Sequence, residues 1–175
     1  PALEAMEFAR VYHTGLRKDG VTPEFEHQIS IALYVRTLDG VLLHPDETLA
    51  TVFLHDTRED YDVSDEEIRE RFGDLVANAV DRMTKEFRGN RKDHAKLFEA
   101  MAEDSIASIA KGVDRIHNFQ SMNAPRPCGR PTFGLEKQKR YIEEARQYFL
   151  PMLKVARRRF PCQEAAYENI KHLLK

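Results

Sequence analysis

Apolar residues recur at helical spacing along almost the whole chain, and this property constrains the fold more than any other. No segment alternates apolar and polar residues for more than four or five positions, as a half-exposed sheet would require. Stretches that contain Gly and Pro separate the periodic segments. With 175 residues, the chain is long enough to bury a full core within one domain. We therefore predict an all-α fold, organised as a single domain over residues 1–175.

Local signals place the ends of the helices. Ser64 and Glu67 have the spacing of a capping box and begin a short helix that ends at Gly73. Pro151 lies inside a long periodic segment, where we expect a kink. Residues 16–26 and 123–134 are expected to be loops. The predicted helices run from about 3 to 14, 29 to 38, 45 to 57, 64 to 72, 75 to 87, 94 to 102, 104 to 122, 135 to 160 and 161 to 175.

Composition excludes several classes of protein. The net charge of −2 favours neither nucleic acid nor an anionic membrane as a partner. The two cysteines, Cys128 and Cys162, form no CxxC pair, which indicates a reducing compartment rather than a zinc knuckle. No apolar run approaches the ~18 residues that predict a membrane span. The N-terminal residues lack the basic and apolar regions of a signal peptide, so we expect a cytoplasmic protein.

The segment FLHDTRED, Phe53 to Asp60, concentrates ionisable groups directly behind apolar residues. If it is helical throughout, His55 shares a face with Glu59, and Asp56 shares one with Asp60. An adjacent imidazole and carboxylate supply the nitrogen and oxygen ligands that divalent transition metals bind. The alternative is a solvated helix end that carries Glu59 and Asp60, with Arg58 in a surface ion pair that contributes little to stability.

Two other segments favour the metal site. His27 begins a helix after a loop, and Asp114 lies in the middle of an apolar, periodic helix. The carboxylate of Asp114 should therefore point inward, where an unpartnered charge is costly. Together with His55 and Asp56 these residues give two imidazoles and two carboxylates. That set can hold one divalent ion and leave positions open for water and a phosphate oxygen.

The same residues carry a resemblance to a known family. The segments LHDTRED, FGDLVANAVDRMTK and DRIHN follow one another in the order and at about the spacing found in HD-domain phosphohydrolases. Over roughly residues 5–150, the chain resembles the hydrolase domain of the RelA/SpoT homologues, especially the free-standing small alarmone hydrolases. The resemblance implies an HD-type helical bundle, with further helices over 135–175. It also implies an enzyme that removes the 3′-diphosphate of guanosine tetra- or pentaphosphate.

The resemblance also assigns roles to individual residues. It implies one metal ion, usually Mn²⁺, bound by His27, His55, Asp56 and Asp114. It implies that Glu59 and Asp60 activate or position the attacking water. The residues it places against the small-molecule nucleotide are Arg17, Lys18, Lys111, Asn118 and Tyr148. His117 matches no ligand position, and we expect it to serve the core or to pack behind the site. Assembly into a homo-oligomer is left open.

Departures from the family pattern affect the nucleotide pocket and leave the metal ligands intact. Glu24 stands where the family has a tyrosine, Gln28 where it has a proline, and Gln120 where it has an arginine. Other nucleotides therefore stay open as substrates: a deoxynucleoside triphosphate such as dATP, an adenine alarmone, or NADPH as a phosphatase substrate. A binding module whose catalysis has decayed is a third hypothesis. The intact set of ligands and the intact Glu59–Asp60 pair argue against it.

Overall fold

The computed structural model describes residues 1–175 and is almost entirely helical, which confirms the predicted all-α fold. Two very short strands form its only sheet. The elements in chain order are α1 (Ala2–Tyr12), α2 (Phe25–Arg36), η1 (Asp39–Val41), α3 (Pro45–Leu54), α4 (Thr57–Tyr61), α5 (Asp65–Phe72), α6 (Asp74–Met83), β1 (Glu86–Phe87), β2 (Asn90–Arg91), α7 (His94–Ala102), α8 (Ala107–Ser121), α9 (Leu135–Glu144), η2 (Ala145–Phe149), α10 (Leu150–Arg159), η3 (Pro161–Gln163) and α11 (Glu164–Leu173).

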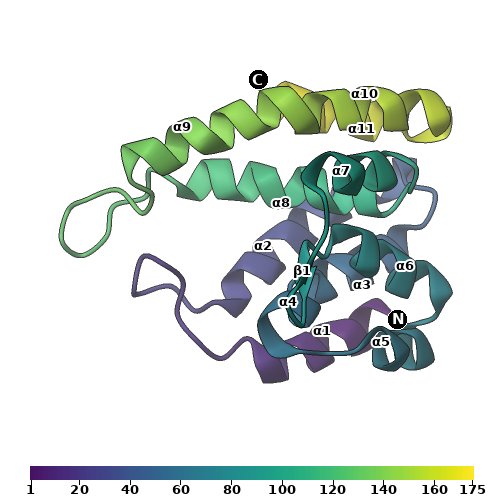
Figure 1. The fold of residues 1–175 in the computed structure, drawn as a ribbon, viewed down its shortest axis with the longest axis horizontal. Helices are drawn as coiled ribbons and strands as arrows, with labels where there is room; N and C mark the ends of the chain where they lie inside the picture. The colour runs from purple at the N-terminus through teal and green to yellow at the C-terminus, as the bar shows by residue number, and fades with distance from the viewer.

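Helix α8 runs through the middle of the molecule (Figure 1). The C-terminal helices α9 to α11 cover it on one side, and α1 to α6 lie on the other. Helix α8 contacts α2, α3 and α6 as well as α7, α10 and α11, so it joins the two parts. The buried apolar side chains form one continuous core, which includes Ile31, Leu54, Ile109 and Phe149. None of the helices combines the length and the apolar character that crossing a membrane requires.

The predicted ends of α5 are confirmed. The side chain of Ser64 accepts a hydrogen bond from the backbone N–H of Glu67 at 3.1 Å and caps the helix. The helix ends at Gly73, whose φ of 85° is a conformation that side-chain-bearing residues rarely adopt.

The helix predicted over 75–87 is wrong in its last turn. Helix α6 ends at Met83, and the chain then forms a β-hairpin in which Glu86 pairs with Arg91 and Phe87 with Asn90. The two residues of the turn, Arg88 and Gly89, have φ values of 49° and 80°. A two-residue hairpin loop with two positive φ values matches the twist of its strands.

The helix predicted from 45 through 57 is interrupted. Helix α3 ends at Leu54 and α4 begins at Thr57, so His55 and Asp56 lie at a break between two helices. The hydroxyl of Thr57 donates to the carbonyl of Leu54 at 2.6 Å across this break. The expectation that one continuous helix carries both His55 and Glu59 is therefore wrong.

The long C-terminal helix has the irregularity expected near Pro151. A π-helical turn, η2, separates α9 from α10 and ends just before the proline. Proline has no backbone N–H to donate to the preceding turn, and a wider turn accommodates that loss. One additional residue in such a turn also rotates every side chain that follows it relative to α9.

Candidate metal centre and the cavity beside it

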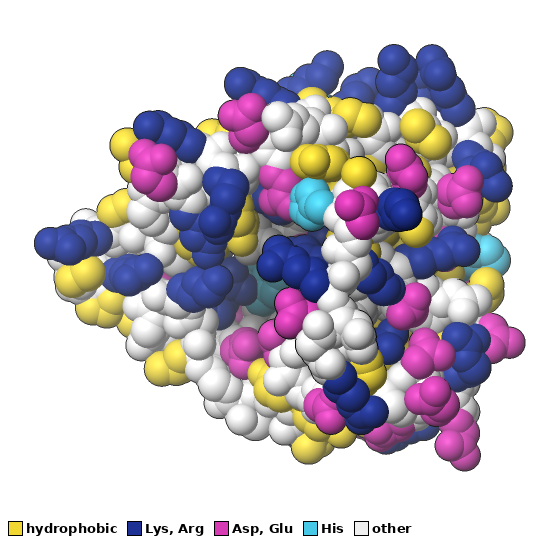
Figure 2. Space-filling view, in the orientation of Figure 1, with side chains coloured by type: hydrophobic (Ala, Val, Ile, Leu, Met, Phe, Trp, Pro, Cys, Tyr) yellow, Lys and Arg dark blue, Asp and Glu magenta, His cyan; other side chains and the backbone are white.

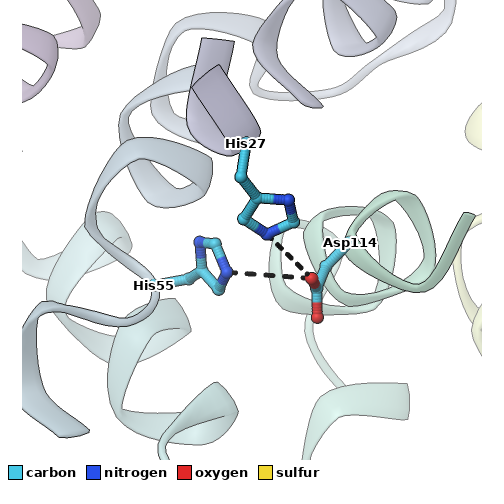
Figure 3. Close-up of side chains that lie close together, drawn as sticks. All are labelled: His27, His55 and Asp114. Atoms are coloured by element: carbon cyan, nitrogen blue, oxygen red, sulfur yellow. Dashed lines mark ion pairs between the residues drawn. The ribbon is translucent and has the colours of Figure 1, made fainter. Parts of the chain in front are cut away.

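The predicted ligands come together from three parts of the fold. His27 lies at the start of α2, His55 and Asp56 at the break between α3 and α4, and Asp114 in the middle of α8. One ligand atom each from His27, His55 and Asp114 lies within 4.8 Å of the others. The Oδ1 of Asp114 is 3.2 Å from His27 Nε2 and 3.9 Å from His55 Nε2. Both imidazoles point toward this carboxylate (Figure 3).

Asp56, the fourth predicted ligand, is partly exposed and lies beside His55. Its Oδ2 lies 3.0 Å from His55 Nε2, but without the geometry of a hydrogen bond, and this buried nitrogen has no hydrogen-bond partner. The other ring nitrogen of His55, Nδ1, lies 2.8 Å from the carbonyl of Val52 and can donate to it. The buried, unsatisfied Nε2 amid carboxylate oxygens is the arrangement that a divalent metal ion would satisfy. The donors present thus fit a metal ion.

The electrostatics of His55 support the same conclusion. Burial alone would lower the pKa of His55, but the adjacent carboxylates of Asp56 and Asp114 raise it to about 9. The surroundings therefore favour a positive charge at this nitrogen, which either a proton or a divalent cation can supply.

Asp114 is buried, as predicted, and two residues on the same helix hold it. Lys111 Nζ lies 3.2 Å from Oδ2, and Asn118 Nδ2 donates to Oδ1 at 2.8 Å. The spacings of three and four residues place all three side chains on one face of α8. Burial would raise the pKa of Asp114, but Lys111 and the two histidines hold it well below its usual range. The carboxylate is therefore ionised and fixed in orientation.

A cavity of about 320 Å³ is lined by three of the four predicted ligands, His27, Asp56 and Asp114, and His55 does not line it. Figure 2 shows a hollow on this face, with Lys and Arg side chains gathered around it. The structure places the predicted residues Arg17, Lys18, Lys111 and Asn118 on its walls, together with Glu59. The lining residues that sequence reasoning missed include Lys85, Arg115, Thr132, Phe133 and Tyr141.

The two predicted catalytic carboxylates occupy different positions. Glu59 lines the cavity, and its carboxylate accepts a hydrogen bond from the backbone N–H of Lys85, just before the hairpin. Asp60 does not line the cavity. Partial burial, with the negative charges of Asp56 and Glu59, raises the pKa of Asp60 to about 6.

The loop that carries Arg17 and Lys18 is internally braced. The backbone N–H of Arg17 donates to the carbonyl of Thr22 at 2.8 Å. Asp19 accepts hydrogen bonds from the hydroxyl and backbone N–H of Thr22, which hold its pKa at about 2. Glu24, at the end of this loop, also lines the cavity and accepts a hydrogen bond from the hydroxyl of Tyr61 at 2.7 Å.

Four cations around the cavity have no acidic partner: Arg17, Lys18, Lys85 and Lys137 form no ion pair in the structure. Lys18 and Lys137 lie over the ring of Phe133, with their Nζ atoms 6.0 and 3.8 Å from its centroid. Partial burial and the proximity of Lys18 lower the pKa of Lys137 to about 8. Such a group of unpaired cations is suited to an anionic ligand.

Tyr148, which the resemblance places against the nucleotide, lines a neighbouring cavity rather than this one. It is absent from the walls of this cavity and packs on His94 and Phe98, with ring centroids 4.5 and 5.3 Å away. Tyr148 lies within the π turn η2, whereas Tyr141, two turns earlier on α9, lines the cavity. The guanidinium of Arg115 lies over the Tyr141 ring, 4.2 Å from its centroid.

Known proteins resemble the chain in sequence and in structure. It is 31% identical over 153 residues to a probable guanosine-3′,5′-bis(diphosphate) 3′-pyrophosphohydrolase from Synechocystis sp., a match to 83% of this chain and 19% of that protein. The Aquifex aeolicus guanosine-3′,5′-bis(diphosphate) 3′-pyrophosphohydrolase is also 31% identical, over 85% of this chain and 20% of its own length. The chain thus spans about a fifth of the length of the curated relatives it matches.

A solved structure described as a metazoan ortholog of SpoT that hydrolyzes ppGpp has the same fold. Its TM-score is 0.70 at 22% identity, and the match covers 98% of this chain and 93% of that one. The family model for the HD domain matches residues 5–141, which contain all four predicted metal ligands. The chain therefore belongs to the HD domain family.

Proposed function

We propose that this chain hydrolyses guanosine tetra- or pentaphosphate at the 3′-diphosphate, with one divalent metal ion, Mn²⁺, bound by His27, His55, Asp56 and Asp114. The observation that carries the proposal is that the buried group of His27, His55 and Asp114 adjoins a cavity bordered by unpaired cations. The ligands suit a metal ion, and the cations suit a substrate with several phosphates. The activity that the names of its relatives state is the one this site would perform.

A bound metal ion would polarise a phosphoryl oxygen and lower the pKa of a water molecule. Glu59 is then the better placed of the two predicted catalytic carboxylates to take the proton of that water, because it faces the cavity and Asp60 does not. Its hydrogen bond from Lys85 N–H fixes the orientation of the carboxylate in advance.

The remaining walls would bind the nucleotide. The guanidinium of Arg17 can stack on a purine, whereas the ammonium groups of Lys18 and Lys137 supply charge for phosphates. Lys111 and Asn118 contact Asp114 and also line the cavity, so each would hold the carboxylate and contact the substrate. Because stacking accepts any purine, hydrogen-bonding groups such as Glu24 must select the base.

The test is a panel of nucleotides incubated with Mn²⁺ and followed by product analysis. The panel contains guanosine tetraphosphate, its adenine counterpart, dATP and NADPH, and the control is Asp114→Asn, which removes a ligand anion while nearly preserving shape. We expect pyrophosphate from guanosine tetraphosphate and none from the variant. A preference of more than tenfold for dATP would refute the alarmone assignment while leaving the metal site intact.

One observation favours a second candidate, the removal of phosphate from NADPH. A neighbouring cavity of about 670 Å³ shares Lys85, Arg115 and Tyr141 with the first. This space could receive a group attached beyond the phosphates of the nucleotide, as in a dinucleotide. Release of inorganic phosphate from NADPH in the same panel would support it. The cytoplasmic location and the homo-oligomer stay predictions.

A further inference from the structure

His117 lies directly behind one of the proposed metal ligands. Its Nδ1 is 2.7 Å from the Nδ1 of His27, and the two ring centroids are 4.7 Å apart. His117 follows Asp114 by three residues on α8, so the helix that supplies one proposed ligand also supplies the group that contacts another. Nothing in the family resemblance gives His117 a role at the metal.

A contact of 2.7 Å between two ring nitrogens requires one donor and one acceptor. His27 Nε2 faces Asp114 and the proposed metal position, so it must be unprotonated to act as a ligand. A neutral imidazole carries one proton, which then resides on His27 Nδ1 and is donated to His117. His117 must therefore accept at Nδ1 and carry its own proton on Nε2.

The second imidazole ligand is oriented in a different way. His55 Nδ1 lies 2.8 Å from the backbone carbonyl of Val52, an acceptor that no side-chain substitution removes. The orientation of His27, in contrast, depends on one side chain. Groups that accept from the outer nitrogen of a metal-bound histidine fix its tautomer and ring orientation.

We propose that His117 is a positioning residue of the metal centre, which holds His27 in the tautomer and orientation that metal binding needs. The proposal rests on the metal site of the proposed function, but not on its substrate. It requires a hydrogen-bond acceptor at position 117, whereas a merely structural role would require only a side chain of similar volume.

The dissociation constant of Mn²⁺, measured by isothermal titration calorimetry, separates these roles. We expect His117→Leu, which keeps the volume and removes the acceptor, to weaken Mn²⁺ binding by roughly 10- to 100-fold. His117→Gln, whose side-chain oxygen can accept from His27, should bind within a few-fold of the native chain. The control is His172→Leu, at an exposed histidine on α11, which should leave the dissociation constant unchanged.

Native binding in His117→Leu, or equal weakening in the Leu and Gln variants, would overturn the proposal. A measurement on the native chain covers the case in which the variants do not fold. In the Zn²⁺-loaded protein, ¹⁵N NMR of the histidine rings should find the proton of His27 on Nδ1. A proton on Nε2 would overturn the proposal. Because binding is measured without substrate, a native chain that binds Mn²⁺ but hydrolyses no nucleotide refutes only the proposed function.

Discussion

The guanidinium of Arg58 donates to the carboxylate of Asp81 across 2.6 Å. The same guanidinium lies 4.5 Å from the ring centroid of Phe87 in the hairpin. Arg58 thereby ties α4 to α6 and to β1, one residue before Glu59. The hydrogen bond from Lys85 N–H to Glu59 also joins α4 to the segment between α6 and β1. The proposed base therefore lies on a short helix that is held from two directions.

Replacing Arg58 should measure the strength of this attachment. Arg58→Met keeps an apolar stem beside Phe87 but leaves Asp81 without its closest cation. Because the Asp81 side chain is 46% exposed, water can solvate it, and we expect a loss of about 1–2 kcal/mol rather than the larger cost of a fully buried pair. The measurement is urea unfolding of the metal-free protein. The matched control is Arg88→Met, whose ion pair with Asp62 is exposed on both sides and should contribute much less. Equal losses would show that burial of Arg58 adds nothing.

The two predicted catalytic carboxylates should differ in importance. Glu59→Gln retains an oxygen that can accept from Lys85 N–H, but it cannot take a proton. We expect native metal binding and a turnover number lower by roughly 10²-fold or more, the effect of losing a general base. Asp60→Asn should cost less, because Asp60 does not line the cavity. Steady-state kinetics with Mn²⁺ and guanosine tetraphosphate give both numbers. A larger loss in Asp60→Asn would move the catalytic role to that residue.

The sequence predicted the helices whose signals are local, and it failed where tertiary contacts decided the backbone. The capping residue Ser64 and the terminal Gly73 mark α5 from within the chain. The break at His55 and Asp56, in contrast, follows apolar residues that continue a helical pattern. The hairpin after Met83 is stabilised by Arg58 on Phe87, a contact between segments far apart in sequence. No periodicity shows such a contact.

The residues of the candidate site show the same contrast between signals within the sequence and contacts that only the fold creates. Asp114 could be recognised because a carboxylate on an apolar helix face needs a partner, and the structure brings His27 and His55 to it. Lys85 and Lys137 were missed because their roles depend on where the hairpin and α9 pack. Tyr148 lies inside the π turn, whose geometry helical spacing does not predict, and its contact with the nucleotide stays a prediction.

Gly112 tests how closely α8 must approach α11. A Cβ at this position would lie 2.7 Å from Cγ2 of Ile170, a fully buried side chain. Gly to Ala within a helix normally stabilises a protein by about 0.5–1 kcal/mol. We expect the opposite sign here, a loss of about 1–3 kcal/mol from overpacking. Thermal and urea unfolding of Gly112→Ala measure it, with Gly40→Ala as the control, because nothing lies within 4 Å of a Cβ there. A more stable Gly112→Ala variant would show that α11 can shift without cost.

The free energy of unfolding at high pH should depend on Tyr167, a fully buried residue of α11 that contacts α8. Its hydroxyl lies 2.9 Å from Ser108 Oγ and accepts from Gln163 Nε2 at 3.1 Å. Burial raises the pKa of Tyr167 to about 12 from the 10.0 of the unfolded chain. The stabilisation is therefore complete below pH 10 and declines as the pH rises to about 12, because the unfolded chain ionises first. A pKa raised from 10.0 to about 12 corresponds to a loss of ~3 kcal/mol in the free energy of unfolding as the pH rises through these two values.

Tyr167→Phe isolates this contribution from the other groups that titrate at high pH. At pH 8 the variant should be less stable by about 1–3 kcal/mol, since Ser108 and Gln163 lose a buried partner. As the pH rises from 10 to 12 the native chain loses stability through Tyr167 and the variant does not, so the difference between them should shrink toward zero. The free energy of unfolding of both chains, from urea titrations at pH 8, 10, 11 and 12, gives this difference directly. A difference that stays constant over the whole range would mean that the Tyr167 hydroxyl ionises equally easily in the folded and unfolded chains, which is incompatible with its burial against α8.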